Sequence, residues 1–409
     1  MVALEPILMI EAVETKVLTR SPLESVHQRL GATMNERDGW SVPESYGDVL
    51  LEYAAVRERG AGLIDLSPRG RILVSGTEAV QFLNGLITND MKTLAEHSWM
   101  PAAFPNVQGR LIASVRVARL KDEGTDKKVS PTFLIDTEAA THERVLKTIE
   151  RFTLAGDFRV TDVTNDTAQL SLQGTQAVQA AAKVFGVAVT ELADRNATRG
   201  AARSAAQFAW PTSDQTGSID LTVLRASHTG ADGFDIVVSA DHAAAVWEAL
   251  QQASARPVGY GALELLRIEA GVPCYGRDMD ETNIVTEATL DDAVSYTKGC
   301  YIGQEIIARI KYRGHVAKKL AGVVFEKAVN IAAGALIHSA DGKEVGRLTS
   351  VAYSPHLGRT IALAYLKYDY LAPGTNVQIV AGEPELTAQV TELPFFSSDS
   401  SSGSSQANV

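Results

Sequence analysis

The chain has 409 residues, of which 45% are hydrophobic and 21% are charged. This composition excludes a disordered chain and is typical of a soluble protein with two or three domains. Lysine and arginine number 38 against 49 aspartates and glutamates, which gives a net charge of −11. The chain as a whole therefore does not attract nucleic acid or anionic lipid, and an anionic partner would need a local basic patch.

Few residues are suited to a resident metal or to a disulfide framework. The two cysteines, Cys274 and Cys300, cannot form a four-cysteine site, and the eight histidines show no His-Glu-x-x-His spacing. No apolar stretch approaches the roughly 20 residues that span a bilayer, and the first sixteen residues lack the basic start of a signal peptide. We therefore expect a cytoplasmic protein with no metal site and no membrane partner.

Helices and strands alternate in the N-terminal half. Residues 1–45 show no sustained hydrophobic period and predict an extension packed loosely on the main body. Hydrophobic spacing and turn residues then predict three helices, over 46–59, 77–87 and 138–152, the second with Thr77 as its N-cap. The strands predicted in this half cover residues 63–67, 71–76, 110–120, 132–136 and 157–163.

The second half changes from mixed to all-β character. A strand, a helix, a pair of strands and two further helices are predicted over 168–174, 175–185, 218–239, 241–252 and 259–269. Beyond Lys319, short apolar runs between Gly and Pro turns predict a small antiparallel barrel. The expected fold class is α+β. The segments are an extension (1–45), a core of two subdomains (46–317), a barrel (318–396) and a disordered Ser-rich tail (397–409).

The stretch YTKGCYIGQEIIARIKYRG is the most unusual in the chain. Cys300 follows Lys298 by two residues and precedes a helix predicted after Gly303, and a helix start favours the thiolate. A basic strip follows, made of Arg309, Lys311, Arg313, Lys318 and Lys319. Two interpretations are open: a packing cysteine beside a solvated strand face, or a reactive thiol beside an anion-binding strip. Cys274 has no comparable neighbours and is interpreted as packing.

Two further residues could bind a ligand. Asp235, at the start of an apolar strand, could accept hydrogen bonds from a planar amidine-like edge such as that of a pterin or a guanine, or could be a surface residue of a hairpin turn. Arg267 lies inside an apolar helix, where it could extend to solvent, pair with Asp235, or bind a ligand anion.

Several stretches together resemble the glycine-cleavage T-protein (aminomethyltransferase) superfamily: AVRERGAGLIDLS, VSGTEAVQFLNGLITND, TGADGFD and LRIEAGVPCYGRDMDE. The stretch KGCYIGQEIIARIKYRG resembles the signature of its YgfZ branch, a tetrahydrofolate-binding group related to iron–sulfur assembly factors. The resemblance covers about residues 40–395. It implies two interleaved α+β domains around a central folate channel and a C-terminal antiparallel β-barrel.

The resemblance also implies roles for residues. Asp235, Arg267, Tyr296 and His228 would bind tetrahydrofolate or a derivative, with His228 standing where T-proteins usually carry a tyrosine. Cys300 matches the functional thiol of the branch. The other residues of that motif are Lys298, Gly299, Tyr301, Gly303, Gln304, Glu305 and Arg309.

Two functions follow from the resemblance. The leading interpretation is a folate-binding protein that supports assembly or repair of iron–sulfur clusters in client proteins, including enzymes that modify tRNA, with client proteins or assembly factors as partners. Cys300 would act as a transient thiol, a cluster contact or a redox-active group, and the basic strip could receive a folate polyglutamate tail or an acidic client. The alternative is a folate-dependent aminomethyltransferase or a related one-carbon transferase. Against the alternative, Ala113 and Ser114 stand where aminomethyltransferases carry two acids, and a positioned catalytic group contributes about 10²–10⁴-fold in rate. Direct RNA binding is not expected, because the chain is acidic and offers few stacking aromatic residues beside the basic strip.

Overall fold

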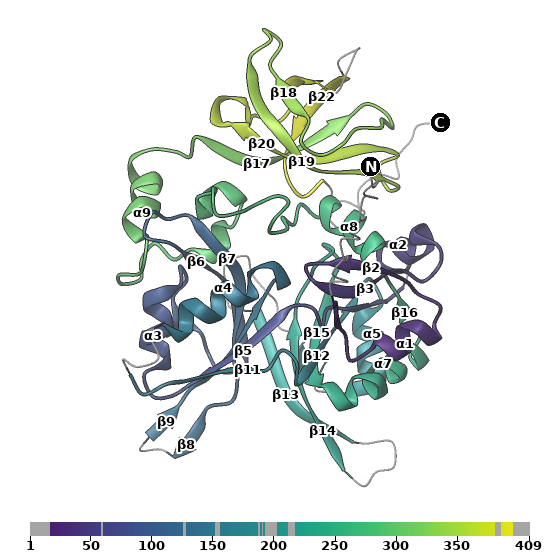
Figure 1. Ribbon diagram of the computed structural model, residues 1–409, viewed down its shortest axis with the longest axis vertical. Helices are drawn as coiled ribbons and strands as arrows, with labels where there is room; N and C mark the ends of the chain where they lie inside the picture. The colour runs from purple at the N-terminus through teal and green to yellow at the C-terminus, as the bar shows by residue number, and fades with distance from the viewer. Residues whose placement is uncertain are drawn as a thin grey trace, which may run out of the picture.

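The computed structural model describes residues 17–58, 60–125, 128–151, 156–186, 189, 191–192, 203–211, 217–380 and 386–395. These residues form a mixed α+β body around an eleven-stranded sheet, with a closed barrel above it and a small three-stranded sheet at one side (Figure 1). The predicted α+β class and the predicted barrel are therefore confirmed. The first sixteen residues and the predicted disordered tail, 397–409, lie outside the described residues.

The large sheet consists of two halves that meet at its centre. The strands run in the order β11 (Arg159–Asp162), β5 (Gly70–Ser75), β10 (Thr132–Thr137), β7 (Leu111–Arg119), β6 (Ser98–Pro105), β13 (Arg203–Pro211), β14 (Ser218–Arg225), β15 (Gly233–Ser239), β12 (Thr167–Gln173), β4 (Gly62–Asp65) and β16 (Arg256–Pro257). Within the part of the chain that the structure describes, only the pairs Ser98↔Ser204 and Trp99↔Arg203 join β6 to β13. The junction is therefore short, and each half keeps a hydrophobic core of its own.

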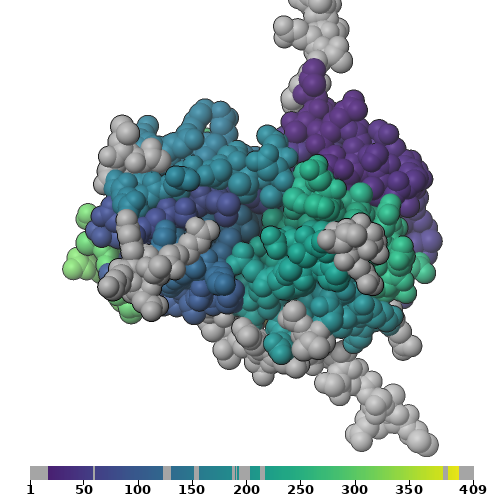
Figure 2. Space-filling model, turned by 90° about the horizontal axis from the view of Figure 1, so that it is seen from below, coloured from purple at the N-terminus to yellow at the C-terminus, as the bar shows by residue number. Residues whose placement is uncertain are grey.

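Helices cover each half by burying an apolar face against the strands. On the first half these are α3 (Ala79–Leu86) and α4 (Ala139–Glu150), and on the second half α5 (Ala177–Phe185) and α7 (Ala243–Gln252). In α4, for example, Val145 and Ile149 lie four residues apart and are both fully buried. A third pair, α2 (Val49–Arg57) and α8 (Tyr260–Glu269), packs together beside β4. Seen from below, the two halves lie side by side (Figure 2).

The N-terminal segment 17–45 differs from the loosely packed extension that was expected. It forms β1 (Thr19–Arg20), α1 (Glu24–Arg29), β2 (Thr33–Arg37) and β3 (Trp40–Ser45), and it packs against the second half of the sheet (Figure 2). Leu23 and Val26 are buried in the core of that half. The imidazole Nε2 of His27 lies 2.8 Å from the Asp65 carboxylate. The segment is therefore an integral layer of the body.

The C-terminal barrel closes in the order β17 (Lys318–Phe325), β20 (Arg359–Lys367), β19 (Glu344–Ser354), β18 (Leu336–His338), β21 (Asn376–Val380) and β22 (Leu386–Thr391). Polar contacts connect it to α8: Ser354 donates to Glu269 and Arg267 donates to Ser350 (2.6 Å). The remaining elements are α9 (Gln304–Arg313), the hairpin of β8 (Glu123–Thr125) and β9 (Lys128–Ser130), and short 3₁₀ turns at Met91–Thr93, Ala240–His242, Val285–Ala288, Asp291–Ala293 and Tyr368–Tyr370. Among the described residues, no helix has the length and apolar character needed to cross a membrane.

Candidate functional site

A cavity of about 500 Å³ opens where the two halves of the sheet, α8 and the β2–β3 hairpin meet. This volume lies within the range of small-molecule and cofactor pockets. Its apolar walls come from Val42, Leu66, Pro68, Leu263, Met279 and Leu290. Its polar groups include Glu36, Arg69, Ser114, Arg116, Glu138, His228, Tyr260, Glu264, Arg267 and Cys274. An apolar cavity with a few convergent polar groups has the character expected of a ligand site.

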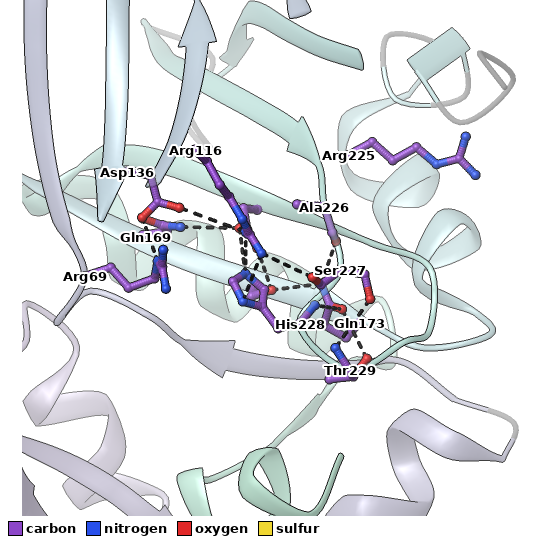
Figure 3. A network of polar contacts seen from close by, with 12 residues as sticks. Arg69, Arg116, Asp136, Gln169, Gln173, Arg225, Ala226, Ser227, His228 and Thr229 are labelled. Carbon is purple, nitrogen blue, oxygen red and sulfur yellow. Dashed lines mark hydrogen bonds and ion pairs between the residues drawn. The ribbon is translucent and has the colours of Figure 1, made fainter. Parts of the chain in front are cut away.

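One wall is built on the buried carboxylate of Asp235 in β15. Arg116 from β7 donates to Oδ2 at 2.7 Å, and the Nε2 of His228 lies 2.8 Å from the same oxygen. Ser171 donates to Oδ1 at 2.7 Å. Figure 3 shows Arg116 and His228 side by side. Burial would raise the pKa of Asp235, but His228, Arg116 and Ser171 together hold that pKa well below its usual range. Burial and the neighbouring arginine lower the pKa of His228. The wall therefore presents a guanidinium and an imidazole to the cavity, both held by a buried carboxylate.

Asp235 stands behind this wall, whereas Arg116 and His228 line the cavity. The prediction that Asp235 itself contacts a pterin stays a prediction, and in the structure its two oxygens already accept from protein side chains. Arg116 was missed by the sequence analysis. It sits two residues after Ser114 on the alternating strand β7, so both side chains point to the same face of the sheet.

A second ion pair continues the wall. Arg69 donates to Asp136 at 2.6 Å, and the other oxygen of Asp136 lies 4.0 Å from Arg116 (Figure 3). Two buried acceptors near these arginines, Oδ2 of Asp136 and Oε1 of Gln169, have no hydrogen-bond partner among the described residues. Two arginines are thus matched by two aspartates, so the wall offers directed hydrogen bonds more than net positive charge.

Arg267 lines the cavity, but its guanidinium is already held by protein groups. It donates to Glu264 at 2.5 and 3.1 Å, to Asp278 at 2.5 Å and to the Val272 carbonyl at 3.2 Å. The pairing with Asp235 that was considered from the sequence is replaced by these contacts. Arg267 therefore joins α8 to the loop that follows it and, through Ser350, to the barrel.

The loop after α8 brings Cys274 to the cavity, a residue that was interpreted as packing alone. The Glu138 carboxylate accepts from the Tyr275 amide at 3.0 Å and lies beside the Cys274 thiol. Burial, followed by Glu138, raises the pKa of Cys274. Burial also raises the pKa of Glu138, against the opposing effect of Arg69. Burial therefore makes both groups harder to ionise than they would be in water.

The predicted motif around Cys300 lies outside this cavity, and Lys298 has a structural task there. Its ammonium donates to the carbonyls of Asn84 (2.8 Å), Ile87 (2.8 Å) and Asn89 (2.6 Å), just where α3 ends. These include carbonyls that the end of a helix leaves without a partner. Burial lowers the pKa of Lys298 to about 8. The side chain points inward, so its donors serve the backbone and not the Cys300 thiol.

Other residues of the motif pack as well. Tyr301 is buried in a small cluster with Tyr275 and Ile307, and Tyr296 lies at its edge. Gly303 has a φ of 77°, and a Cβ there would approach the Asn106 carbonyl to 2.3 Å. Cys300 itself is exposed, as are Gly299, Glu305 and Arg309, while Gln304 is half-buried. Neither Cys300 nor Tyr296 lines the cavity, and their predicted roles stay predictions.

The basic strip is exposed along α9, whereas its last two members, Lys318 and Lys319 at the start of β17, are half-buried. Arg309, Lys311 and Arg313 form no ion pair with the carboxylates of the described part of the chain, and Lys311 lies over the Tyr296 ring. Lys319 pairs with Asp291 at 2.9 Å. Within the described ranges, no three His, Cys, Asp or Glu side chains lie together as they would around a metal ion.

A body of two α+β halves around a central cavity, capped by a six-stranded barrel, defines the class of the protein. Residues 23–298 match the family model described as the GCVT N-terminal domain, and residues 318–397 match the glycine cleavage T-protein C-terminal barrel domain. The chain belongs to the glycine cleavage T-protein family. The T-protein part of the predicted resemblance is thereby confirmed, and the YgfZ branch stays a prediction.

Similar proteins share nearly the whole chain. It is 32% identical over 385 residues to an aminomethyltransferase of Geobacillus kaustophilus, covering 93% of this chain and 99% of that protein. It is 31% identical over 395 residues to an aminomethyltransferase of Symbiobacterium thermophilum, covering 93% and 98%. A crystal structure of glycine cleavage system aminomethyltransferase T from Bartonella henselae has the same fold, with a TM-score of 0.80 at 24% identity over 93% of this chain and 98% of that one.

Proposed function

We propose that this protein is a folate-dependent transferase of the aminomethyltransferase type, which passes a one-carbon group between a donor and tetrahydrofolate bound in the cavity. The observation that carries this proposal is the cavity itself, about 500 Å³ with apolar walls and a wall of oriented polar groups. Aminomethyltransferases with 31–32% identity over nearly their full length support the reaction class. This was the alternative interpretation of the sequence, and it replaces iron–sulfur support as the first candidate.

The residues that line the cavity suit a flat, polar-edged ligand. Arg116 and His228 supply polar groups at one edge, with Asp235 behind them to fix their orientation. Leu66 and Tyr260 provide apolar and aromatic surface for the faces of a ring. Tetrahydrofolate, when bound, supplies the nitrogen atoms that carry the one-carbon group. The protein binds it, orients it and limits the access of water.

The test compares two arginines of the same strand. Arg116→Gln should weaken tetrahydrofolate binding by about 10- to 100-fold, because a hydrogen bond from a charged group contributes about 1.5–3 kcal/mol. Arg119→Gln is the matched control, since Arg119 pairs with Asp122 outside the cavity. Binding is measured by calorimetry, and turnover as methylenetetrahydrofolate formed from an aminomethyl donor. A wild-type protein that does not bind tetrahydrofolate, or that binds it but does not form this product, would refute the proposal.

A second candidate function is favoured by one observation, the exposed Cys300 beside the basic strip. In this function the folate-bound protein would support iron–sulfur client proteins or assembly factors through that thiol, with a transient cluster as cargo. Gene deletion followed by complementation with wild type and with Cys300→Ser tests it, reading the activity of cluster-dependent enzymes. Full rescue by the serine form would remove the thiol from the function.

A further inference from the structure

We propose that Glu138 is the proton-transfer group of the cavity, and that its carboxyl exchanges one proton with a nitrogen atom of the bound substrate. The proposal rests on the proposed function, because it takes the substrate to be tetrahydrofolate or the aminomethyl donor. It adds a residue that no motif in the sequence indicated.

The register of the sheet places Glu138 in the cavity. In the antiparallel pair of β10 and β7, Thr137 lies opposite Val115, so the next position along each strand puts Glu138 beside Ser114. Both residues line the cavity. Glu138 is also the N-cap residue of α4, but its side chain makes no capping hydrogen bond. The carboxyl is therefore directed away from the helix end and toward the cavity wall.

The contacts of Glu138 leave its charge unmatched. Its carboxylate accepts from the Tyr275 amide at 3.0 Å, and no Lys, Arg or His nitrogen of the described residues lies within 4.0 Å of it. Two cations, Arg69 and Arg267, act on it from farther away, and each already has its own ion pair, Arg69 with Asp136 and Arg267 with Glu264 and Asp278. The Cys274 thiol lies beside the carboxylate and can donate a hydrogen bond to it. Glu138 is half-buried in the cavity wall, and a carboxyl that is partly removed from water without a salt bridge retains its proton more readily than an exposed one.

Glu264, another carboxyl of the same cavity, is ion-paired and has a pKa shifted in the opposite direction. It is paired with Arg267 at 2.5 Å and Arg277 at 2.8 Å, and although burial opposes the effect, these arginines lower its pKa. The pKa of Glu138, in contrast, is raised by burial. Two carboxyls whose surroundings shift their pKa values in opposite directions are typical of an acid–base site. In this cavity Glu264 would be the permanent anion and Glu138 the group that gains and loses a proton.

The step is a proton exchange without electron transfer. The O–H bond of Glu138 breaks, an N–H bond forms on the substrate, and the carboxylate left behind keeps the Tyr275 N–H and the nearby charge of Arg69. The proton returns to the carboxylate from a substrate nitrogen before the next turnover. Glu138 thus brings to the cavity a carboxyl that the neighbouring Ala113 and Ser114 do not provide.

The test compares two glutamates of one region. Glu138→Gln should lower kcat for methylenetetrahydrofolate formation by about 10²–10⁴-fold with little change in KM, and should abolish one limb of the pH profile. Glu143→Gln is the control, since Glu143 lies on α4 with its side chain 78% exposed and paired with Lys147. A second measurement needs no turnover: calorimetry of tetrahydrofolate binding in buffers of different ionisation enthalpy counts the protons that move on binding. We expect a pH-dependent proton count in wild type and Glu143→Gln that Glu138→Gln loses.

The outcomes separate the two proposals. A wild-type protein that forms no product but binds folate with a proton count that depends on Glu138 would end the transferase proposal and keep the proton-transfer group. If Glu138→Gln has wild-type kcat or the wild-type proton count, Glu138 is not that group.

If the Glu138→Gln protein does not unfold cooperatively, Glu138→Asp is tested in its place. The aspartate form keeps a titrating carboxyl on a shorter stem, so kcat should fall at least tenfold with the proton count retained, and an unchanged kcat overturns the proposal.

Discussion

The cavity wall at Asp235 and the loop at Lys298 are both built on a buried charge, and the two use it differently. At Lys298 the ammonium donates to three backbone carbonyls. At Asp235 the carboxylate is enclosed, but the Arg116 guanidinium that it holds keeps 16% of its side chain exposed and lines the cavity. The comparison indicates that a buried charge bonded to backbone groups stabilises the fold. A buried charge bonded to a side chain that lines a cavity orients that side chain for ligand binding.

The largest effect should come from removing the charge of Asp235. Asp235→Asn leaves Arg116 buried without its main counter-ion, and breaking one partner of a buried pair costs about 3–5 kcal/mol. Tetrahydrofolate binding should weaken as well, because Arg116 and His228 lose their common acceptor. Urea unfolding and calorimetry measure the two losses. If stability falls but folate affinity is unchanged, the wall is structural, like the loop at Lys298.

The same carboxylate predicts a dependence on pH. Its pKa in the folded protein is held below the ordinary value of 3.8, so its contribution to stability is present above pH 3.8 and is lost as the pH falls through the folded pKa. Asp235→Asn should therefore lose less stability than wild type when the pH is lowered through this range. Unfolding curves at a series of acidic pH values measure the difference, and parallel losses in the two proteins would contradict it.

Next in size is the loss of the Lys298 ammonium. Lys298→Met keeps an unbranched side chain without the terminal ammonium. It leaves the carbonyls of Asn84, Ile87 and Asn89 without their donor, which should cost about 2–3 kcal/mol. Because these carbonyls lie at the end of α3 and outside the cavity, folate affinity should remain within about twofold of wild type. A large loss of folate affinity in a protein of near-normal stability would show that Lys298 contributes to folate binding and not only to the stability of the fold.

Local patterns in the sequence predicted most of the elements. Strand β7 and the barrel follow from alternation, and α4 from its helical spacing. Strand β6 was missed because SWMPAAFP contains two prolines, which usually exclude a strand. Thr77 was predicted as an N-cap, but its hydroxyl donates to Asp157 at 2.7 Å and α3 starts after Glu78 without a side-chain cap.

Only part of the site could be predicted from the sequence, because some of its residues depend on partners that lie far away along the chain. His228 and Arg267 were assigned from motifs, and both line the cavity. Arg116 and Glu138 have no motif, and their importance depends on partners far away in sequence. Arg116 is 119 residues from Asp235, and Glu138 is 137 residues from Tyr275. Only the register of the sheet and the loop after α8 bring these groups together.

A smaller loss should follow substitution at Gly303. Gly303→Ala places a Cβ at a φ of 77° and toward the Asn106 carbonyl, which should cost about 1–2 kcal/mol. The strain falls on the start of α9, so the folded state should keep its folate affinity. Thermal unfolding and folate titration measure the two quantities. Gly299→Ala is the control, because a Cβ there meets no atom within 4 Å.

The smallest effect on stability is expected at Cys300, the residue of the motif that the packing does not explain. Cys300→Ser exchanges one exposed atom and should change the free energy of unfolding by less than about 0.5 kcal/mol. Because Cys300 does not line the cavity, folate affinity and transferase turnover should also be unchanged. A loss confined to cluster-dependent enzymes in cells would then show that the α9 surface has a function separate from the cavity. A loss of folate turnover in the purified serine form would contradict the separation of the two regions, because it would make the loop part of the site.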